Sequence, residues 1–230
     1  MRGIIAVRRY HLTVSTPEFP KRDPATPEFW DLRYGASFAP WDAGQVPARL
    51  REFAASRSPR RALVPGCGSA HDVAFLAAER WDVTGIDFSP EAVKAARAVL
   101  GPFASRVREA DFFAPIPGEP FDVVYERAFL CALPRRLWPD WAQRVAALLA
   151  PGGLLAGFFF LAEGERGPPF PLHSQAELDA LLASHFERLE DRDVPDSIPV
   201  FAGKERWQIW RRKGSDPFFT KKGTDPDLSP

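Results

Sequence analysis

A short glycine loop is the first feature of this 230-residue sequence that could bind a ligand. Gly66 and Gly68 flank Cys67 directly after an apolar run, and a helix-like segment follows them. Glycines at such a position let a ligand approach the backbone closely and permit positive φ angles. Because many tight turns share a lone Gly-x-Gly pattern, the residues beyond the loop decide what it means.

An acidic residue follows the loop at the spacing typical of nucleoside binding. Asp87 ends the next predicted strand, about 20 residues on, where a carboxylate commonly accepts both hydroxyls of an adenosine ribose. The third glycine of a dinucleotide fingerprint would fall at His71, whose side chain would obstruct the close helix–strand approach of that fingerprint. S-adenosyl-L-methionine has no pyrophosphate and does not need that approach. The spacing therefore favours S-adenosylmethionine, with an oxidoreductase as the alternative.

A carboxylate and an aromatic ring follow the third predicted strand. Asp111 could accept a hydrogen bond from the amino group of adenine, and Phe112 could lie beside the ring. Taken alone, the pair could equally be a solvated turn and a buried phenylalanine. Three such features at successive strand ends predict one nucleoside site.

The end of the fourth predicted strand offers a group for the methyl acceptor. Arg127 could hold an anion or lower the pKa of a thiol, and Phe38 and Phe129 could supply aromatic walls. A dry apolar pocket favours the charge loss that occurs when an anion attacks a sulfonium. Glu126 could orient the arginine or face the donor site. Alternatively, Arg127 simply pairs with Glu126 or Asp122.

The elements that must position these residues alternate between strand and helix. This order predicts a Rossmann-like, doubly wound seven-stranded α/β sheet in a single domain, with ligands at the carboxyl ends of its strands. The expected strands are residues 61–64, 82–87, 106–110, 121–125, 154–161, 187–194 and 205–211. The expected helices are a short one around residues 50–54 and longer ones at about 72–80, 89–100, 141–149 and 175–186.

The amino-acid composition indicates which kinds of binding partner to expect. Lysine plus arginine total 30 and aspartate plus glutamate total 30, so no basic surface for nucleic acid or an anionic membrane is expected. No apolar run approaches the length of a membrane span. The two cysteines lack metal or redox spacing, so we expect no metal and a cytoplasmic location. We also expect a monomer that acts on a small-molecule substrate.

Both ends of the chain differ from its middle. Prolines and a repeated Thr-Pro-Glu-Phe motif mark residues 1–26 as an N-terminal arm, which we expect to be partly disordered. A charged Gly/Pro echo marks residues 214–230 as a disordered tail. The domain itself is expected to span residues 27–213.

Several ordered motifs carry a resemblance to a known family. The chain resembles the thiopurine S-methyltransferase family, which implies the class I S-adenosylmethionine-dependent methyltransferase fold. The last of the motifs looks especially like the halide and thiol methyltransferase branch. The motifs are FWDLRY at 29–34, PWDAG at 40–44, LVPGCG at 63–68, FLCAL at 129–133, LAPGG at 149–153 and PDSIP at 195–199.

The resemblance implies a set of cofactor contacts. Residues 30–41 would fold over S-adenosylmethionine, and Gly66 would face its methionine part. The side chains implied to contact the cofactor are Trp30, Tyr34, Trp41, Asp87, Asp111 and Phe112.

The resemblance is mixed at two positions that bear on the acceptor. Arg127 matches the thiopurine branch, whereas the halide branch is expected to carry tyrosine there, and Tyr34 stands where that branch tends to carry tryptophan. The implied activity is methyl transfer to a small thiol or halide. An oxygen, nitrogen or metalloid acceptor, or a non-catalytic S-adenosylmethionine-binding protein, stays open as an alternative.

Overall fold

The computed structural model describes residues 17–42 and 44–214 of the chain. Most of the expected N-terminal arm (residues 1–16 of 1–26) and of the expected disordered tail (residues 215–230 of 214–230) lies outside the described ranges. The strands are β1 (Arg61–Pro65), β2 (Asp82–Asp87), β3 (Val107–Glu109), β4 (Phe121–Arg127), β5 (Leu149–Phe160), β6 (Phe186–Asp193) and β7 (Glu205–Arg212). The α-helices are α1 (Pro27–Gly35), α2 (Ala48–Ala55), α3 (His71–Ala78), α4 (Pro90–Leu100), α5 (Trp138–Leu148) and α6 (Gln175–Leu182).

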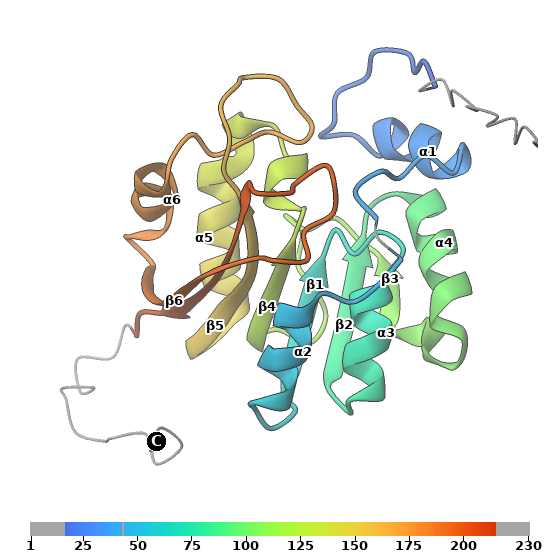
Figure 1. The fold of residues 1–230 in the computed structure, drawn as a ribbon. Coiled ribbons are helices and arrows are strands. Elements are labelled where there is room, and N and C mark those ends of the chain that lie inside the picture. Colours follow the sequence, from blue (N-terminus) through green and yellow to red (C-terminus); the bar gives the residue numbers. More distant parts are fainter. Residues whose placement is uncertain (1–16, 43, 215–230) are drawn as a thin grey trace, which may run out of the picture.

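The seven strands form one sheet in the order β3-β2-β1-β4-β5-β7-β6 (Figure 1). The first five strands along the chain pair in parallel, whereas β7 is antiparallel to both β5 and β6. The strand order reverses between β1 and β4, which is where a doubly wound sheet opens a crevice for ligands. This arrangement confirms the predicted seven-stranded α/β fold.

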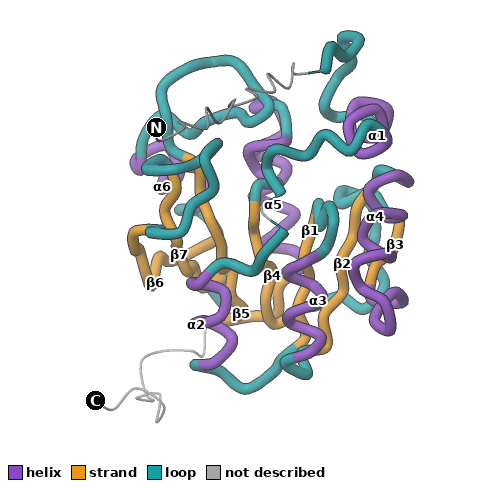
Figure 2. The backbone as a smooth tube through the Cα atoms, turned by 45° about the vertical axis from the view of Figure 1, so that its right-hand side comes forward, coloured by secondary structure: helices purple, strands orange, loops and turns teal. Residues whose placement is uncertain are grey.

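Helices cover both faces of the sheet (Figure 2). One buried cluster joins α5 and α6 to inward-facing strand residues such as Leu63 and Val124. A second cluster joins α2, α3 and α4 to the neighbouring residues Ala62 and Val123. Adjacent strand residues point to opposite faces, so continuous apolar strands fill both layers.

The larger differences from the prediction concern β5, α6 and an additional helix, α1. β5 begins at Leu149 rather than residue 154, because Leu149 pairs with Phe121 of β4. The Pro-Gly-Gly segment forms an irregularity before the pairing resumes between Leu154 and Val123. α6 ends at Leu182, and Phe186 begins β6. Phe186 packs in the same core cluster as Leu178 and Leu182 of α6. Because these residues are spaced four apart, the sequence suggested that Phe186 still belonged to the helix. Helix α1 starts with Pro27, at a position where proline is tolerated, and residues 17–42 are together called the arm from here on.

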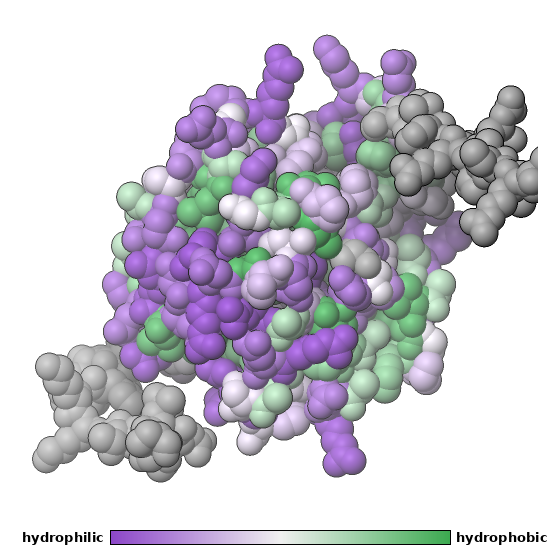
Figure 3. Space-filling model, viewed as in Figure 1, coloured by the Kyte–Doolittle hydropathy of each residue, from purple (hydrophilic) through white to green (hydrophobic). Residues whose placement is uncertain are grey.

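The sheet has a charged edge. β6 is the outer strand, and six of its eight residues are charged: Glu187, Arg188, Glu190, Asp191, Arg192 and Asp193. Figure 3 shows hydrophilic residues gathered over this side of the molecule. Charged side chains discourage edge-to-edge pairing with another sheet. Within the described ranges, no helix combines the length and apolarity needed to cross a membrane.

Candidate active site

A cavity of about 540 Å³ lies at the carboxyl ends of the central strands, under the arm that carries α1. The structure brings ten of the eleven residues singled out from the sequence into its wall, and Glu126 is the exception. The ten are Trp30, Tyr34, Phe38, Trp41, Gly66, Asp87, Asp111, Phe112, Arg127 and Phe129. The residues singled out from the sequence thus lie together around one cavity, and that this cavity is the active site and the role of each residue stay proposals.

The loop after β1 requires glycine at both positions. Gly66 and Gly68 have φ angles of +56° and +50°, which disfavour side chains. A Cβ on Gly66 would also overlap the ring of Phe129, and one on Gly68 would overlap the hydroxyl of Tyr34. The loop therefore lets the arm and the turn after β4 close directly onto the backbone.

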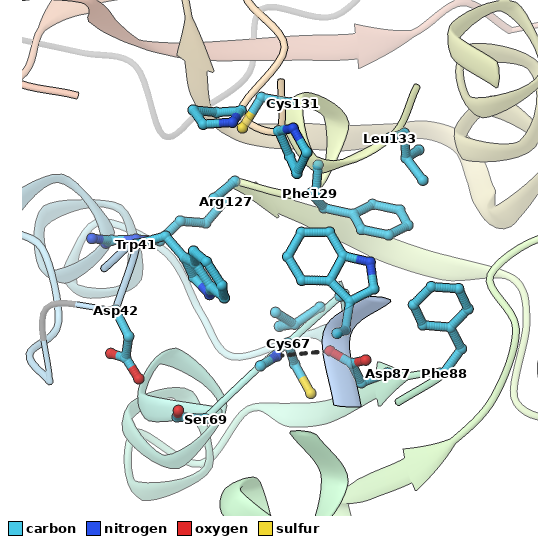
Figure 4. A pocket seen from close by; sticks show the side chains of 18 of the residues that line it. Trp41, Asp42, Cys67, Ser69, Asp87, Phe88, Arg127, Phe129, Cys131 and Leu133 are labelled. Carbon is cyan, nitrogen blue, oxygen red and sulfur yellow. Dashed lines mark hydrogen bonds between the residues drawn. The ribbon is translucent and has the colours of Figure 1, made fainter. Parts of the chain in front are cut away.

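Asp87 ends β2 beside this loop. Its Oδ2 accepts a hydrogen bond from the Gly68 N–H at 3.1 Å, and its Oδ1 accepts one from the Ser89 N–H at 3.0 Å. Figure 4 draws the first of these as a dashed line. Burial raises the pKa of Asp87 to about 6, although the backbone donors act in the opposite direction. Each oxygen keeps lone pairs, so the carboxylate can accept two further hydroxyl groups.

Phe112 and Asp111 both line the cavity, where the sequence predicts the adenine. Phe112 is buried, and its ring centroid lies 5.0 Å from that of Phe129 in an edge-to-face arrangement. Asp111 is exposed at the cavity rim, where its Oδ1 accepts a hydrogen bond from the Phe113 N–H at 2.9 Å. A flat ring can therefore lie against Phe112 with a carboxylate at its edge.

Aromatic residues of the arm pack against one another over the loop. The Trp41 Nε1–H donates to the Tyr34 hydroxyl at 3.2 Å, and the Trp30 and Trp41 rings meet edge to face at 5.4 Å. The ring centroids of Phe38 and Trp41 are 6.5 Å apart. Residues 30–41 thus cover one side of the cavity, as the family resemblance implied.

A residue that sequence reasoning missed ties the arm to the domain. Asp31 Oδ1 accepts hydrogen bonds from Ser89 Oγ at 2.6 Å and from the Glu91 N–H at 3.2 Å. Ser89 in turn caps α4 by accepting from the Ala92 N–H at 3.1 Å, as suits a serine directly before the first residue of a helix. An isolated aspartate in the arm carries no pattern that points to a helix terminus far along the chain.

Arg127 has a partner that the sequence did not indicate. Its Nε lies 3.9 Å from Asp72 Oδ2, and its guanidinium lies 5.1 Å from the ring centroid of Phe158. The alternative pairing with Glu126 or Asp122 is wrong, because those carboxylates bind backbone N–H groups instead. Asp72 was missed because an acidic residue in the first turn of a helix usually serves the helix dipole.

The prediction that Glu126 lines the substrate pocket is also wrong. Its Oε1 accepts hydrogen bonds from the N–H groups of Phe129 and Leu130, at 2.8 and 3.0 Å. The side chain is buried, and burial raises its pKa to about 7. Glu126 therefore holds the turn that places Phe129 and does not face the cavity.

The remaining wall comes from segments late in the chain. The segment between β6 and β7 contributes Val200 and Phe201, and it carries the PDSIP motif. Asp196 of this motif fastens the segment to α2 by accepting from the Ala48 N–H at 2.7 Å. Cys131, a free thiol, adds a small apolar surface. Among the described residues, no cluster of His, Cys, Asp and Glu could hold a metal ion.

Comparison with known proteins identifies the family to which the chain belongs. The family model for thiopurine S-methyltransferase matches residues 25–213. Thiocyanate methyltransferase 1 of Brassica oleracea is 31% identical over 191 residues, which cover 80% of this chain and 84% of the relative. A thiopurine S-methyltransferase of Vibrio cholerae is 33% identical over 177 residues, covering 68% of this chain and 80% of the relative.

The fold is shared with a solved methyltransferase structure. The 1,6-didemethyltoxoflavin-N1-methyltransferase of Burkholderia thailandensis, solved with S-adenosylhomocysteine, aligns with a TM-score of 0.64. The alignment covers 86% of this chain and 94% of that one at 20% identity, which speaks for the fold alone. With the family match over most of the chain, this protein belongs to the thiopurine S-methyltransferase family and is an S-adenosylmethionine-dependent methyltransferase.

Proposed function

We propose that this enzyme transfers a methyl group from S-adenosylmethionine to the sulfur of a small thiol, with halide and thiocyanate ions as further acceptors. One observation carries the proposal. Arg127 brings a guanidinium to a wall of the cavity that is otherwise rich in apolar side chains. Figure 4 shows its side chain well apart from the Asp87 carboxylate. An anion held by Arg127 would thus approach from a different side than the adenosine.

The residues around Asp87 fit the adenosyl part of the cofactor. The carboxylate has lone pairs for the two ribose hydroxyls, Phe112 offers a ring face for adenine, and Gly66 leaves the backbone accessible. When bound, S-adenosylmethionine supplies an electrophilic methyl group on a positively charged sulfur. Trp30 and Trp41 of the arm line this part of the cavity and would exclude water from it once the cofactor is bound.

The surroundings of Arg127 suit an anionic sulfur nucleophile. Phe129, Cys131 and Phe201 surround the acceptor end with apolar surface. An anion and a sulfonium react to give two neutral products, so a dry pocket favours the transition state over the separated charges. Positioning and exclusion of water would supply most of the rate enhancement.

The relatives support both kinds of acceptor. One is named for thiocyanate, a small anion, and another for thiopurines, which carry sulfur on an aromatic ring. The segment between β6 and β7 resembles the halide and thiol branch, whereas Arg127 matches the thiopurine branch. We therefore propose a thiol as the main acceptor and treat iodide as a test of the halide activity.

Replacement of Arg127 by tyrosine tests the proposal. Arg127→Tyr is expected to lower kcat/KM for benzyl thiol by about 10- to 100-fold, which corresponds to loss of a charged interaction of about 1.5–3 kcal/mol. The affinity for S-adenosylmethionine should stay within about twofold, since Asp87 lies elsewhere in the cavity. Gas chromatography of the headspace would quantify methyl benzyl sulfide and, with iodide, methyl iodide. Unchanged thiol turnover in Arg127→Tyr would refute this role for Arg127.

We further propose that the enzyme works in the cytoplasm as a monomer and does not bind nucleic acid. The zero net charge and the charged edge strand β6 support this proposal. The free thiols of Cys67 and Cys131 are compatible with a reducing compartment.

A further inference from the structure

Three buried polar atoms without hydrogen-bond partners lie together behind the acceptor end of the cavity. They are Asp72 Oδ1, Tyr125 Oη and Arg127 Nη1. Only five such side-chain atoms occur among the described residues, so three in one cluster mark this place as unusual. Buried polar groups are normally satisfied, and an unsatisfied cluster calls for a functional explanation.

Asp72 reaches this cluster from the first turn of α3 and also lines the cavity. Its Oδ1 is enclosed, while Oδ2 lies 3.9 Å from Arg127 Nε. The side chains of Asp72 and Arg127 keep 13% and 20% exposure, respectively. An acceptor held by the guanidinium would therefore lie next to a carboxylate oxygen.

A thiol must lose a proton before or while its sulfur is methylated. We propose that Asp72 takes this proton, with Arg127 beside it to stabilise the thiolate. This inference rests on the proposed thiol activity and assigns Asp72 as the general base for that reaction. Halide and thiocyanate ions carry no such proton, so they would not need Asp72.

The step balances in atoms and electrons. The sulfur–hydrogen bond of the acceptor breaks, and its proton goes to Asp72 Oδ2, which becomes a neutral carboxylic acid. The electron pair left on the acceptor sulfur forms the new bond to the methyl carbon. The pair of the broken carbon–sulfur bond returns to the donor sulfur, and Asp72 later releases its proton to water.

The surroundings suit Asp72 to this task. Burial raises the pKa of its carboxyl group, whereas the positive charge of Arg127 acts against that rise. A higher pKa makes a carboxylate a stronger base. Burial also keeps Tyr125 protonated by raising its pKa, so its hydroxyl can donate toward Asp72.

Other charged groups face the pair from neighbouring elements. His71 adjoins Asp72 on α3, and Asp42 approaches from the arm with its Oδ1 at 3.7 Å from His71 Nε2. Glu205 of β7 acts on Arg127, and its own pKa is raised by burial while Ser197 donates to it at 2.6 Å. Glu205 therefore shares the positive charge of Arg127 with Asp72, which weakens the ion pair between Asp72 and Arg127.

Two thiols that differ in ionisation test this assignment. At pH 7.5, 4-nitrothiophenol is almost wholly thiolate, whereas benzyl thiol is almost wholly protonated. In Asp72→Asn, kcat with benzyl thiol is expected to fall on the order of 10²-fold, the usual contribution of a general base. The kcat with 4-nitrothiophenol should stay within about threefold, as should the affinity for S-adenosylmethionine.

Each outcome is decisive. An equal loss with both thiols would show that Asp72 only holds Arg127 or the fold, and no loss with either would also overturn the assignment. If wild type methylates neither thiol, the proposed function itself fails. Asp140→Asn, at an exposed position in the first turn of α5, is the matched control. Should Asp72→Asn not fold, the wild-type pH profile with benzyl thiol decides. With a general base, kcat/KM should stay constant over the pH range below the pKa of the thiol, whereas a kcat/KM that falls in proportion to the thiolate fraction refutes the base.

Discussion

The carboxylate of Asp87 has to be buried and yet remain able to accept hydrogen bonds. Two backbone N–H groups, from Gly68 and Ser89, hold one oxygen each and fix the plane of the group. Desolvation opposes the charge and raises its pKa to about 6. An ionised carboxylate accepts two hydroxyls, whereas the protonated form must donate from one oxygen. Ribose binding should therefore favour the ionised form.

This linkage predicts a pH dependence of cofactor affinity. The pKa of Asp87 in the free protein is near 6, and ligand binding should lower it. Affinity is then constant above about pH 7 and decreases as the pH falls through 6, by at most tenfold per pH unit. Calorimetric titration with S-adenosylmethionine between pH 5 and 8 measures this.

Asp87→Asn is the control for that titration. It should bind at least 10-fold more weakly at pH 7.5 and lose the decline between pH 7 and 5, because no charge remains to titrate. A wild-type affinity that does not change across pH 6 would contradict the role given to the ionised carboxylate.

At the scale of elements, the arm with α1 covers the cavity and is held to the domain by Asp31 at the start of α4 and by Asp23 at Arg136. Asp31 bonds to both Ser89 and the backbone of Glu91 at the start of α4. Ser89 at this helix start also donates its backbone N–H to Asp87, so the position of the arm and the position of the Asp87 carboxylate both depend on Ser89. Loss of this contact should therefore lower both the affinity for the cofactor and the stability of the fold.

Asp31→Ala should therefore lower both stability and cofactor affinity. The free energy of unfolding is expected to fall by about 1–3 kcal/mol, the range for hydrogen bonds to a charged group. Affinity for S-adenosylmethionine should fall several-fold, since Trp30 and Trp41 lose their fixed position. Urea unfolding and calorimetry measure the two effects.

The comparison variant is Asp23→Ala, which removes an exposed ion pair between the arm and Arg136. Exposed pairs contribute little, so this variant should lose less than about 1 kcal/mol. If Asp31→Ala behaves like Asp23→Ala, the contact with α4 does not hold the arm.

At the scale of the whole molecule, the sheet and its ligand edge followed from local patterns. Apolar runs, the Ser89-Pro90 helix start and the glycine loop each act over a few residues. Their order alone required the loop, Asp87 and Asp111 to meet at one edge of a parallel sheet. This is why the fold and the location of the site could be predicted from the sequence.

What was missed depends on contacts between distant segments. The partner of Arg127 is Asp72, which lies 55 positions earlier in the chain and on a different element. The segment between β6 and β7 reaches the cavity wall because it joins two antiparallel strands at that edge of the sheet. Glu126 was misplaced because strand alternation does not reveal the turn that follows β4.

Direct transfer of label tests the central claim, that the cavity at the ends of β1, β2 and β4 methylates a small thiol. Purified enzyme, methyl-labelled S-adenosylmethionine and benzyl thiol should yield labelled methyl benzyl sulfide and S-adenosylhomocysteine in equal amounts. Asp87→Ala should abolish the product at cofactor concentrations that saturate the wild type. Binding of S-adenosylmethionine by the wild type without transfer to any thiol would contradict the account.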